Sequence, residues 1–178
     1  MRARTLVSSL FASMLVGCAP VSVNAPPPRV DVVSRARVHG KVTLDVSAGL
    51  LCSPEANVCI AGARSQLESG LQRLSDQVFD GAPDAAAYSA TLVVTRFVAV
   101  HQKHGWELTL GWRFRMVSRA GATVVDLDRD TTAPTTVHRT MTGAADESSV
   151  AFAMQGIEDA LITHVAMSLD QLARGTHQ

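Results

Sequence analysis

The sequence lacks the short signatures that accompany most catalytic and nucleotide-binding sites. It contains no His-Glu-x-x-His, no Gly-x-Ser-x-Gly, no Gly-rich phosphate loop and no Ser-x-x-Lys. Nucleophilic catalysis needs a base that is oriented by a third group, and no spacing in the chain proposes such a set. We therefore expect a protein that is not an enzyme and that carries no cofactor.

An excess of basic charge and a long apolar run are also missing. The chain has 16 Lys and Arg residues against 16 Asp and Glu residues. Nucleic acids require a concentrated basic footprint, so this balance excludes nucleic acid as an expected partner. The N-terminal apolar stretch, Thr5 to Val16, is too short to cross about 30 Å of hydrocarbon as a helix.

What that stretch does resemble is an export signal. It follows Arg2 and Arg4 and ends at Leu15-Val16-Gly17-Cys18, an order of basic, apolar and small residues that is typical of secretion. These four residues are similar to the lipobox of bacterial lipoproteins. The resemblance implies that residues 1–17 are a signal peptide, that cleavage leaves Cys18 first, and that its thiol receives diacylglycerol. An ordinary secretory signal with an incidental cysteine remains the alternative.

Acylation of Cys18 would fix where the protein resides. Two or more acyl chains, such as palmitate, hold a protein on a bilayer almost permanently, at about 0.8 kcal/mol per buried methylene. Ala19 stands where an Asp would indicate retention in the inner membrane of the resembled family. We therefore expect a lipid-anchored protein of the cell envelope, at the periplasmic face of the outer membrane.

The mature chain divides into a tether and one domain. Residues 18–38 contain Pro20 and the run Pro26 to Pro28, which favour extended polyproline conformations. The roughly 18 residues from Ala19 to Ala36 would reach about 60 Å at most if fully extended. The valines of this segment leave open that part of it docks as an edge strand. Residues 39–178 are expected to form a single folded domain.

Two cysteines remain after Cys18, and both lie early in the predicted domain. Cys52 and Cys59 are expected to form a disulfide in an oxidising periplasm. Closing this short loop stabilises the fold by roughly 2.5 kcal/mol in the chain-entropy model. A redox-active pair would have the spacing Cys-x-x-Cys, and a zinc site would need two more ligands nearby. We interpret the pair as structural.

Hydrophobic periodicity predicts the secondary structure of the domain. Strands are expected over residues 41–46, 89–100, 106–117 and 122–127, with a further one possible over 135–141, and helices over 61–79 and 148–173; residues 49–59 read as a loop. In the strand 106–117, one face carries Trp106, Leu108, Leu110, Trp112, Phe114 and Met116. These patterns predict an α+β two-layer sandwich, in the order β-α-β-β-β-α, with two helices on one face of a mostly antiparallel sheet of about four strands.

This layout, together with the signal, the lipobox and the Pro-rich tether, resembles the small envelope lipoproteins of Gram-negative bacteria. In layout it is similar to the auxiliary lipoproteins of lipid-trafficking ABC transporters. The resemblance covers about 140 residues as architecture, and only the lipobox matches at residue level. It implies a non-catalytic accessory or assembly subunit that binds an envelope protein. The alternative is an apolar ligand held between sheet and helices by Trp106, Trp112 and Phe114.

Two patterns have the residue types of metal ligands. His101-x-x-His104 lies at a predicted hairpin tip, and Asp126-x-Asp128-x-Asp130 begins like a calcium loop. The histidines lack a third ligand. The aspartates lack the glycine and the bidentate glutamate that a calcium loop requires. We interpret the first pattern as solvated histidines and the second as a polar strand end, so no metal site is expected.

The strand 89–100 is the one element with apolar residues on both faces. Val93 and Phe97 on its second face, flanked by Arg113 and Arg115 of the next strand, predict a surface that contacts a protein partner or lipid. The tether or residues 135–141 would cover the same strip in the alternative interpretation.

The sequence allows two pairing registers for this strand, and they differ in where they place Arg96. If Val100 pairs with Trp106, Arg96 falls opposite Leu110 on the buried face, which is costly for a charged group. A shift by one residue places Arg96 outside but turns two threonines inward, Thr91 and Thr95.

Overall fold

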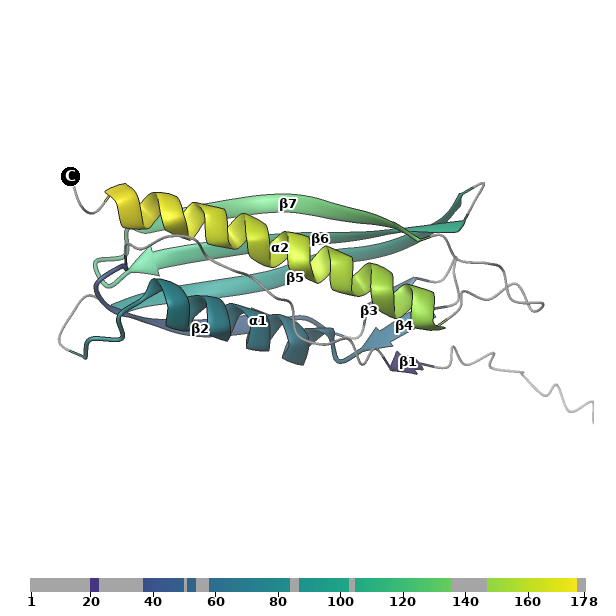
Figure 1. The fold of residues 1–178 in the computed structure, drawn as a ribbon, viewed down its shortest axis with the longest axis horizontal. Coiled ribbons are helices and arrows are strands. Elements are labelled where there is room, and N and C mark those ends of the chain that lie inside the picture. Colours follow the sequence, from purple (N-terminus) through teal and green to yellow (C-terminus); the bar gives the residue numbers. More distant parts are fainter. Residues whose placement is uncertain are drawn as a thin grey trace, which may run out of the picture.

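The computed structural model describes residues 20–22, 37–49, 51–53, 58–83, 87–102, 105–135 and 147–175. Its elements are β1 (Pro20–Ser22), β2 (Lys41–Ser47), β3 (Leu51–Ser53), β4 (Val58–Ala61), α1 (Ala63–Val78), β5 (Ala87–Gln102), β6 (Gly105–Ser118), β7 (Thr123–Thr135) and α2 (Glu147–Gly175). Both helices pack on the same side of the long strands (Figure 1). The predicted α+β two-layer sandwich is confirmed.

The larger sheet has four strands in the order β2-β5-β6-β7. β2 and β5 are parallel, because α1 lies between them in the chain and returns it to the same end. The other two pairs are antiparallel neighbours joined by short connections. β7 is longer than predicted: it continues past Leu127 to Thr135, because its aspartates alternate with inward-facing residues and so keep the period of a strand.

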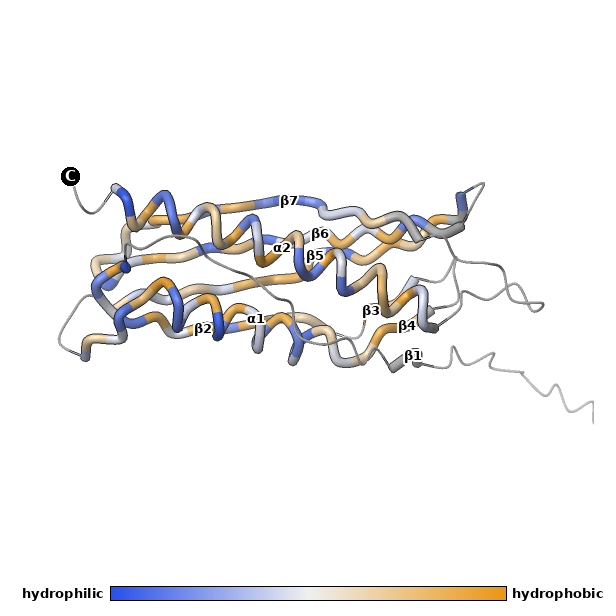
Figure 2. Tube along the Cα trace, in the orientation of Figure 1, coloured by the Kyte–Doolittle hydropathy of each residue, from blue (hydrophilic) through white to orange (hydrophobic). Residues whose placement is uncertain are grey.

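The core lies between this sheet and the two helices. The predicted inner face of β6 is confirmed for five of its residues, which are at most 1% exposed: Leu108, Leu110, Trp112, Phe114 and Met116. One apolar stripe of α1 is buried as well, with Leu67, Leu71, Leu74 and Val78 at most 2% exposed. Figure 2 shows the apolar residues alternating with polar ones along these elements. Each such leucine contributes about 1.5–3 kcal/mol by leaving water.

A disulfide hairpin occupies the stretch that was predicted to be a loop. β3 and β4 pair antiparallel with Cys52 directly opposite Cys59, and the two cysteines form the predicted disulfide. The loop prediction was wrong because strands of three and four residues are too short to show a period. Ser53 joins the hairpin to the large sheet: its Oγ accepts a hydrogen bond from Ala99 N–H at 3.0 Å and donates one to Ala99 O at 3.3 Å.

Two pieces of the predicted tether are packed onto the domain. β1 pairs in parallel with β4, with Pro20 beside Cys59. This part of the tether therefore docks as an edge strand, which is one of the two possibilities that the sequence left open. Val38 is 1% exposed and forms a bridge with Phe79 at the end of α1. Residues 23–36, between these two pieces, lie outside the described residues, as do residues 18 and 19 before β1.

The carboxylate of Asp80 connects the segment around Val38 to the end of α1 through hydrogen bonds. It accepts hydrogen bonds from Ala82 N–H at 3.0 Å and Gly40 N–H at 2.9 Å, and His39 contributes a third. These bonds favour the ionised carboxylate. They lower the pKa of Asp80 to about 2, with Ala82 as the largest cause.

Among the described helices, neither α1 nor α2 has the length and apolarity to span a bilayer.

Candidate functional site

The predicted anchor lies in the part of the chain that the structure does not describe. Leu15, Val16, Gly17 and Cys18 precede β1, whose first residue is Pro20. His104 and residues 136–146 also fall outside the described ranges. The site that the structure does describe is therefore the face of the large sheet that points away from the helices, which we call the outer face.

A β-bulge at Thr95 decides which side chains of β5 reach the outer face. Val94 pairs with Trp112 and Arg96 pairs with the preceding residue, Gly111, so Thr95 is one extra residue. The register that brings Leu92 opposite Phe114 holds before the bulge, and the register shifted by one residue holds after it. Each of the two predicted registers is thus correct over half of the strand. Because Thr95 is an extra residue, the side chains of β5 that face the core are Leu92 and Val94 before the bulge and Phe97 and Ala99 after it.

The bulge corrects the predicted partner surface at one residue. Phe97 pairs with the buried Leu110 and packs against the core, so its assignment to the outer face was wrong. Val93 does lie on the outer face and is 37% exposed. Val100, beyond the bulge, is 39% exposed on the same face. The exposed large apolar residues of β5 on the outer face are therefore Val93 and Val100, and Phe97 is not among them.

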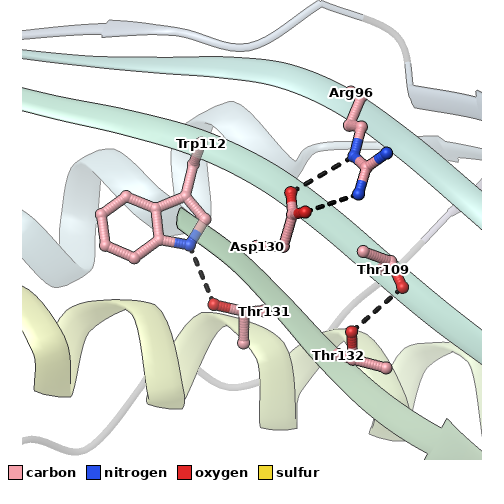
Figure 3. A network of polar contacts seen from close by, with 6 residues as sticks. All are labelled: Arg96, Thr109, Trp112, Asp130, Thr131 and Thr132. Atoms are coloured by element: carbon pink, nitrogen blue, oxygen red, sulfur yellow. Dashed lines mark hydrogen bonds and ion pairs between the residues drawn. The ribbon is translucent and has the colours of Figure 1, made fainter. Parts of the chain in front are cut away.

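Arg96 also reaches the outer face, where it forms an ion pair with a carboxylate of β7. Its Nε donates to Asp130 Oδ1 at 3.2 Å, and a second nitrogen of the guanidinium bonds the other oxygen (Figure 3). Thr109 and Thr132 are hydrogen-bonded beside this pair at 3.1 Å. Both ionic groups remain about half exposed, so the pair orients side chains more than it stabilises the fold.

The ion pair crosses the middle strand over a glycine. Gly111 is the register partner of both Arg96 and Asp130. A Cβ at this position would lie 2.6 Å from Arg96 Cγ and 2.9 Å from Asp130 Oδ1. Only a residue without a side chain therefore lets the two charged groups meet across β6.

Arg113 and Arg115 lie on the outer face as predicted, and both contact β7. Arg113 binds Asp126 through two nitrogens, at 3.2 and 3.0 Å. This hydrogen bonding lowers the pKa of Asp126 and raises the pKa of Arg113. Arg115 donates to Thr123 Oγ1 at 2.9 Å. Of the two arginines, Arg113 is thus paired with a carboxylate and Arg115 is bonded to a neutral hydroxyl.

The three aspartates that begin like a calcium loop lie within β7. Asp126, Asp128 and Asp130 occupy alternate positions of the strand, on the outer face, and two of them bind arginines. Over the ranges that the structure describes, no three His, Cys, Asp or Glu side chains are grouped as a metal site requires. The interpretation of these residues as a polar strand is consistent with that geometry.

Sequence reasoning missed Glu158, which lies in the middle of α2. Its side chain is 0% exposed, and neither carboxylate oxygen has a hydrogen-bond partner among the described residues. Burial, and to a smaller extent the charge of Asp159, raise the pKa of Glu158 to about 8. The signal was present: Glu158 follows the buried Met154 by four residues and precedes Leu161 by three, so it falls within the apolar stripe.

The aromatic residues predicted to line a ligand pocket fill the core. Trp112 and Phe114 are at most 1% exposed, and Trp112 Nε1 donates to Thr131 Oγ1 at 2.9 Å (Figure 3). The Trp106 side chain lies outside the described parts. An open groove occurs elsewhere, where the end of α2 passes over the start of β7. Trp112 and Phe114 therefore serve to pack the sheet against α2.

No protein-family model and no curated protein matches the sequence. Among solved structures, the chain is similar to a "putative lipoprotein" from Caulobacter crescentus CB15, with a TM-score of 0.54 and 14% identity over 76% of this chain and 91% of that one. A minor lipoprotein from Acinetobacter baumannii matches with a TM-score of 0.41 and 15% identity, over 76% and 93% of the two chains. At such identities the first of these likenesses shows a shared fold.

Proposed function

We propose that this chain is a lipid-anchored protein of the cell envelope that acts as a non-catalytic accessory or assembly subunit. The observation that carries the proposal is Leu15-Val16-Gly17-Cys18 behind a short basic and apolar segment. The fold shared with the "putative lipoprotein" from Caulobacter supports it. Acyl chains on Cys18 would hold the domain at the periplasmic face of the outer membrane.

The outer face of the sheet is the surface proposed to bind the protein partner. α1 and α2 both pack on the opposite face (Figure 1), so the described elements leave this one uncovered. Val93 and Val100 supply exposed apolar area, and the Arg96–Asp130 and Arg113–Asp126 ion pairs lie on the same face. A mixture of apolar and hydrogen-bonded polar area is usual for a non-obligate protein interface. A subunit of a lipid-trafficking transporter is the partner that the layout favours.

Site-specific photo-crosslinking tests this assignment in living cells. A benzophenone amino acid at Val93 is expected to capture a specific envelope protein. The same group at Gln72, an exposed position of α1 on the helical side, is the matched control and is expected to capture none. Equal capture from both positions, or none from Val93 while the protein is fully expressed, would contradict a docking role for the outer face.

Membrane attachment is tested separately by replacing Cys18 with Ser. This variant is expected to leave the membrane fraction, because serine lacks the thiol that receives the diacylglyceryl group and its acyl chains. A Cys52→Ser, Cys59→Ser double variant keeps Cys18 and should remain bound to membranes. A Cys18→Ser protein that still sediments with membranes would contradict the lipid anchor.

The alternative function is the binding of an apolar ligand between sheet and helices. The full burial of Trp112 and Phe114 in core packing does not favour it. Native mass spectrometry of protein extracted in mild detergent separates the two proposals: a stoichiometric bound lipid, beyond the acyl chains on Cys18, would support ligand binding.

A further inference from the structure

The position of β1 limits how far the domain can lie from its proposed anchor. Pro20 pairs with Cys59 in the disulfide hairpin, and Cys18 precedes Pro20 by only two residues. Two residues span at most about 7 Å. The length of residues 23–36 adds nothing to this distance, because they follow β1 in the chain. The connection between Cys18 and the described domain is therefore two residues long and is not a long tether.

The hairpin and β1 mark one end of an elongated molecule. Figure 1 shows β1, β3, β4 and the first turns of α2 at the same end of the long axis, with the turn between β6 and β7 and the C-terminal end of α2 at the other. An anchor beside β4 brings the first of these ends to the membrane surface. We call it the hairpin end.

Phe152 is an exposed aromatic residue at the hairpin end. It is the sixth residue of α2, about 8 Å along the axis from the start of the helix. Its side chain is 78% exposed, the highest value among the large apolar residues described. An exposed phenyl group is unfavourable in water and favourable at the boundary between headgroups and acyl chains.

The surroundings of Phe152 on α2 permit close approach to lipid. Its neighbours on the helix surface, three and four residues away, are Ser148, Ser149, Gln155 and Gly156, and none is charged. No charged group of that patch would have to lose water at the membrane. The C-terminal half of α2 exposes a second apolar residue, Met167, at 61%, but charged groups follow it toward the opposite end. They are the Arg174–Asp170 ion pair and Arg119 in the β6–β7 turn.

We propose that the hairpin end faces the bilayer and that Phe152 inserts into the headgroup region of the leaflet that holds Cys18. This orientation rests on the proposed acylation of Cys18. It directs the β6–β7 turn and the C-terminal end of α2 away from that leaflet, toward the space where a partner is met.

Two insertions with the same length and composition test the role of β1. A Gly/Ser insert of about ten residues adds a reach of roughly 17 Å. Placed between Ala19 and Pro20, it lengthens the connection from anchor to domain. Placed between Val23 and Asn24, it lies after β1 and leaves that connection unchanged. The readout is a fluorescent label on Ser148→Cys in acylated full-length protein, reconstituted into phosphatidylethanolamine and phosphatidylglycerol vesicles that contain a lipid-borne doxyl quencher.

The expected result is strong quenching at Ser148→Cys and little at Ala120→Cys, the matched position in the β6–β7 turn. The insert before Pro20 should reduce quenching at position 148 severalfold, and the insert after Val23 should leave it unchanged. Phe152→Ser, combined with the label at 148, should also reduce quenching. Equal quenching at both ends, or equal effects of the two inserts, would overturn the proposed orientation.

Vesicle flotation distinguishes the failure of this inference from failure of the proposed function. Protein that floats with the vesicles but is not quenched at position 148 retains its anchor and refutes only the orientation. Protein that carries no acyl group and does not float refutes the anchor, and the orientation with it.

Discussion

Replacing Glu158 with Gln should stabilise the fold by an amount that grows with pH. Burial raises the pKa of this carboxyl from 4.5 to about 8. Between these values the unfolded chain has released a proton that the folded state still binds, so stability falls as pH rises through this window. At 1.36 kcal/mol per pH unit, the folded state loses about 3 kcal/mol by pH 7 and roughly 5 kcal/mol by pH 8.

The glutamine amide is neutral at every pH in this range and has nearly the same shape. Glu158→Gln should therefore match the wild type at about pH 5 and exceed it by several kcal/mol at about pH 8, in urea unfolding of the mature protein followed by circular dichroism. Glu68→Gln is the control, because Glu68 is an exposed residue of α1. Its profile should follow the wild type. If the free energy of unfolding of Glu158→Gln fell with rising pH as much as that of the wild type, the reasoning from burial would be refuted.

Three further predictions concern packing and polar contacts. Gly111→Ala should lower the free energy of unfolding by about 1–3 kcal/mol, because its Cβ would lie 2.6 Å from a side-chain atom of β5; Gly156→Ala, with open space around it, should not. Ser53→Ala should cost about 1–3 kcal/mol and speed amide exchange at Ala99, whose partner it removes; unchanged exchange would argue against that contact. Asp80→Asn should lower the thermal midpoint near neutral pH and have little effect near pH 2, since the stabilisation by Asp80 is present above its ordinary pKa of 3.8 and is lost as pH falls toward 2.

The sheet and helices were predictable where one face of an element is buried throughout. β6 alternates from Leu108 to Met116, and α1 repeats its leucines at helical spacing, so the period gives both the element and its inner face. Two amphipathic helices and consecutive strands can bury these faces together only as two layers. This part of the fold follows from local pattern alone.

The assignment of Phe97 failed because it depended on a single backbone irregularity. Thr95 adds one residue to β5, and every side chain beyond it changes face relative to an unbroken strand. The sequence contained a sign of this: each unbroken register placed either Arg96 or two threonines in the core. Gly111, opposite Arg96, is the matching feature on β6, and it was not recognised because glycine in a strand has several explanations.

The docking of β1 and the burial of Glu158 depend on tertiary contacts that no local pattern reports. A strand of three residues is too short for a periodic signal, and β1 pairs with a strand almost forty positions away in the sequence. Glu158 occupies a position that the helical stripe marks as buried, but charged residues at such positions usually reach solvent. Both features became visible only when distant segments were placed together.

The intact mass of the protein extracted from membranes of the producing cells tests the central claim most directly. Acylation at Cys18 predicts a chain of residues 18–178 whose mass exceeds that of the polypeptide by a diacylglyceryl group and a further acyl chain, with the surplus confined to the N-terminal peptide. A mature chain recovered in the soluble fraction, with Cys18 bearing an unmodified thiol, would contradict the account.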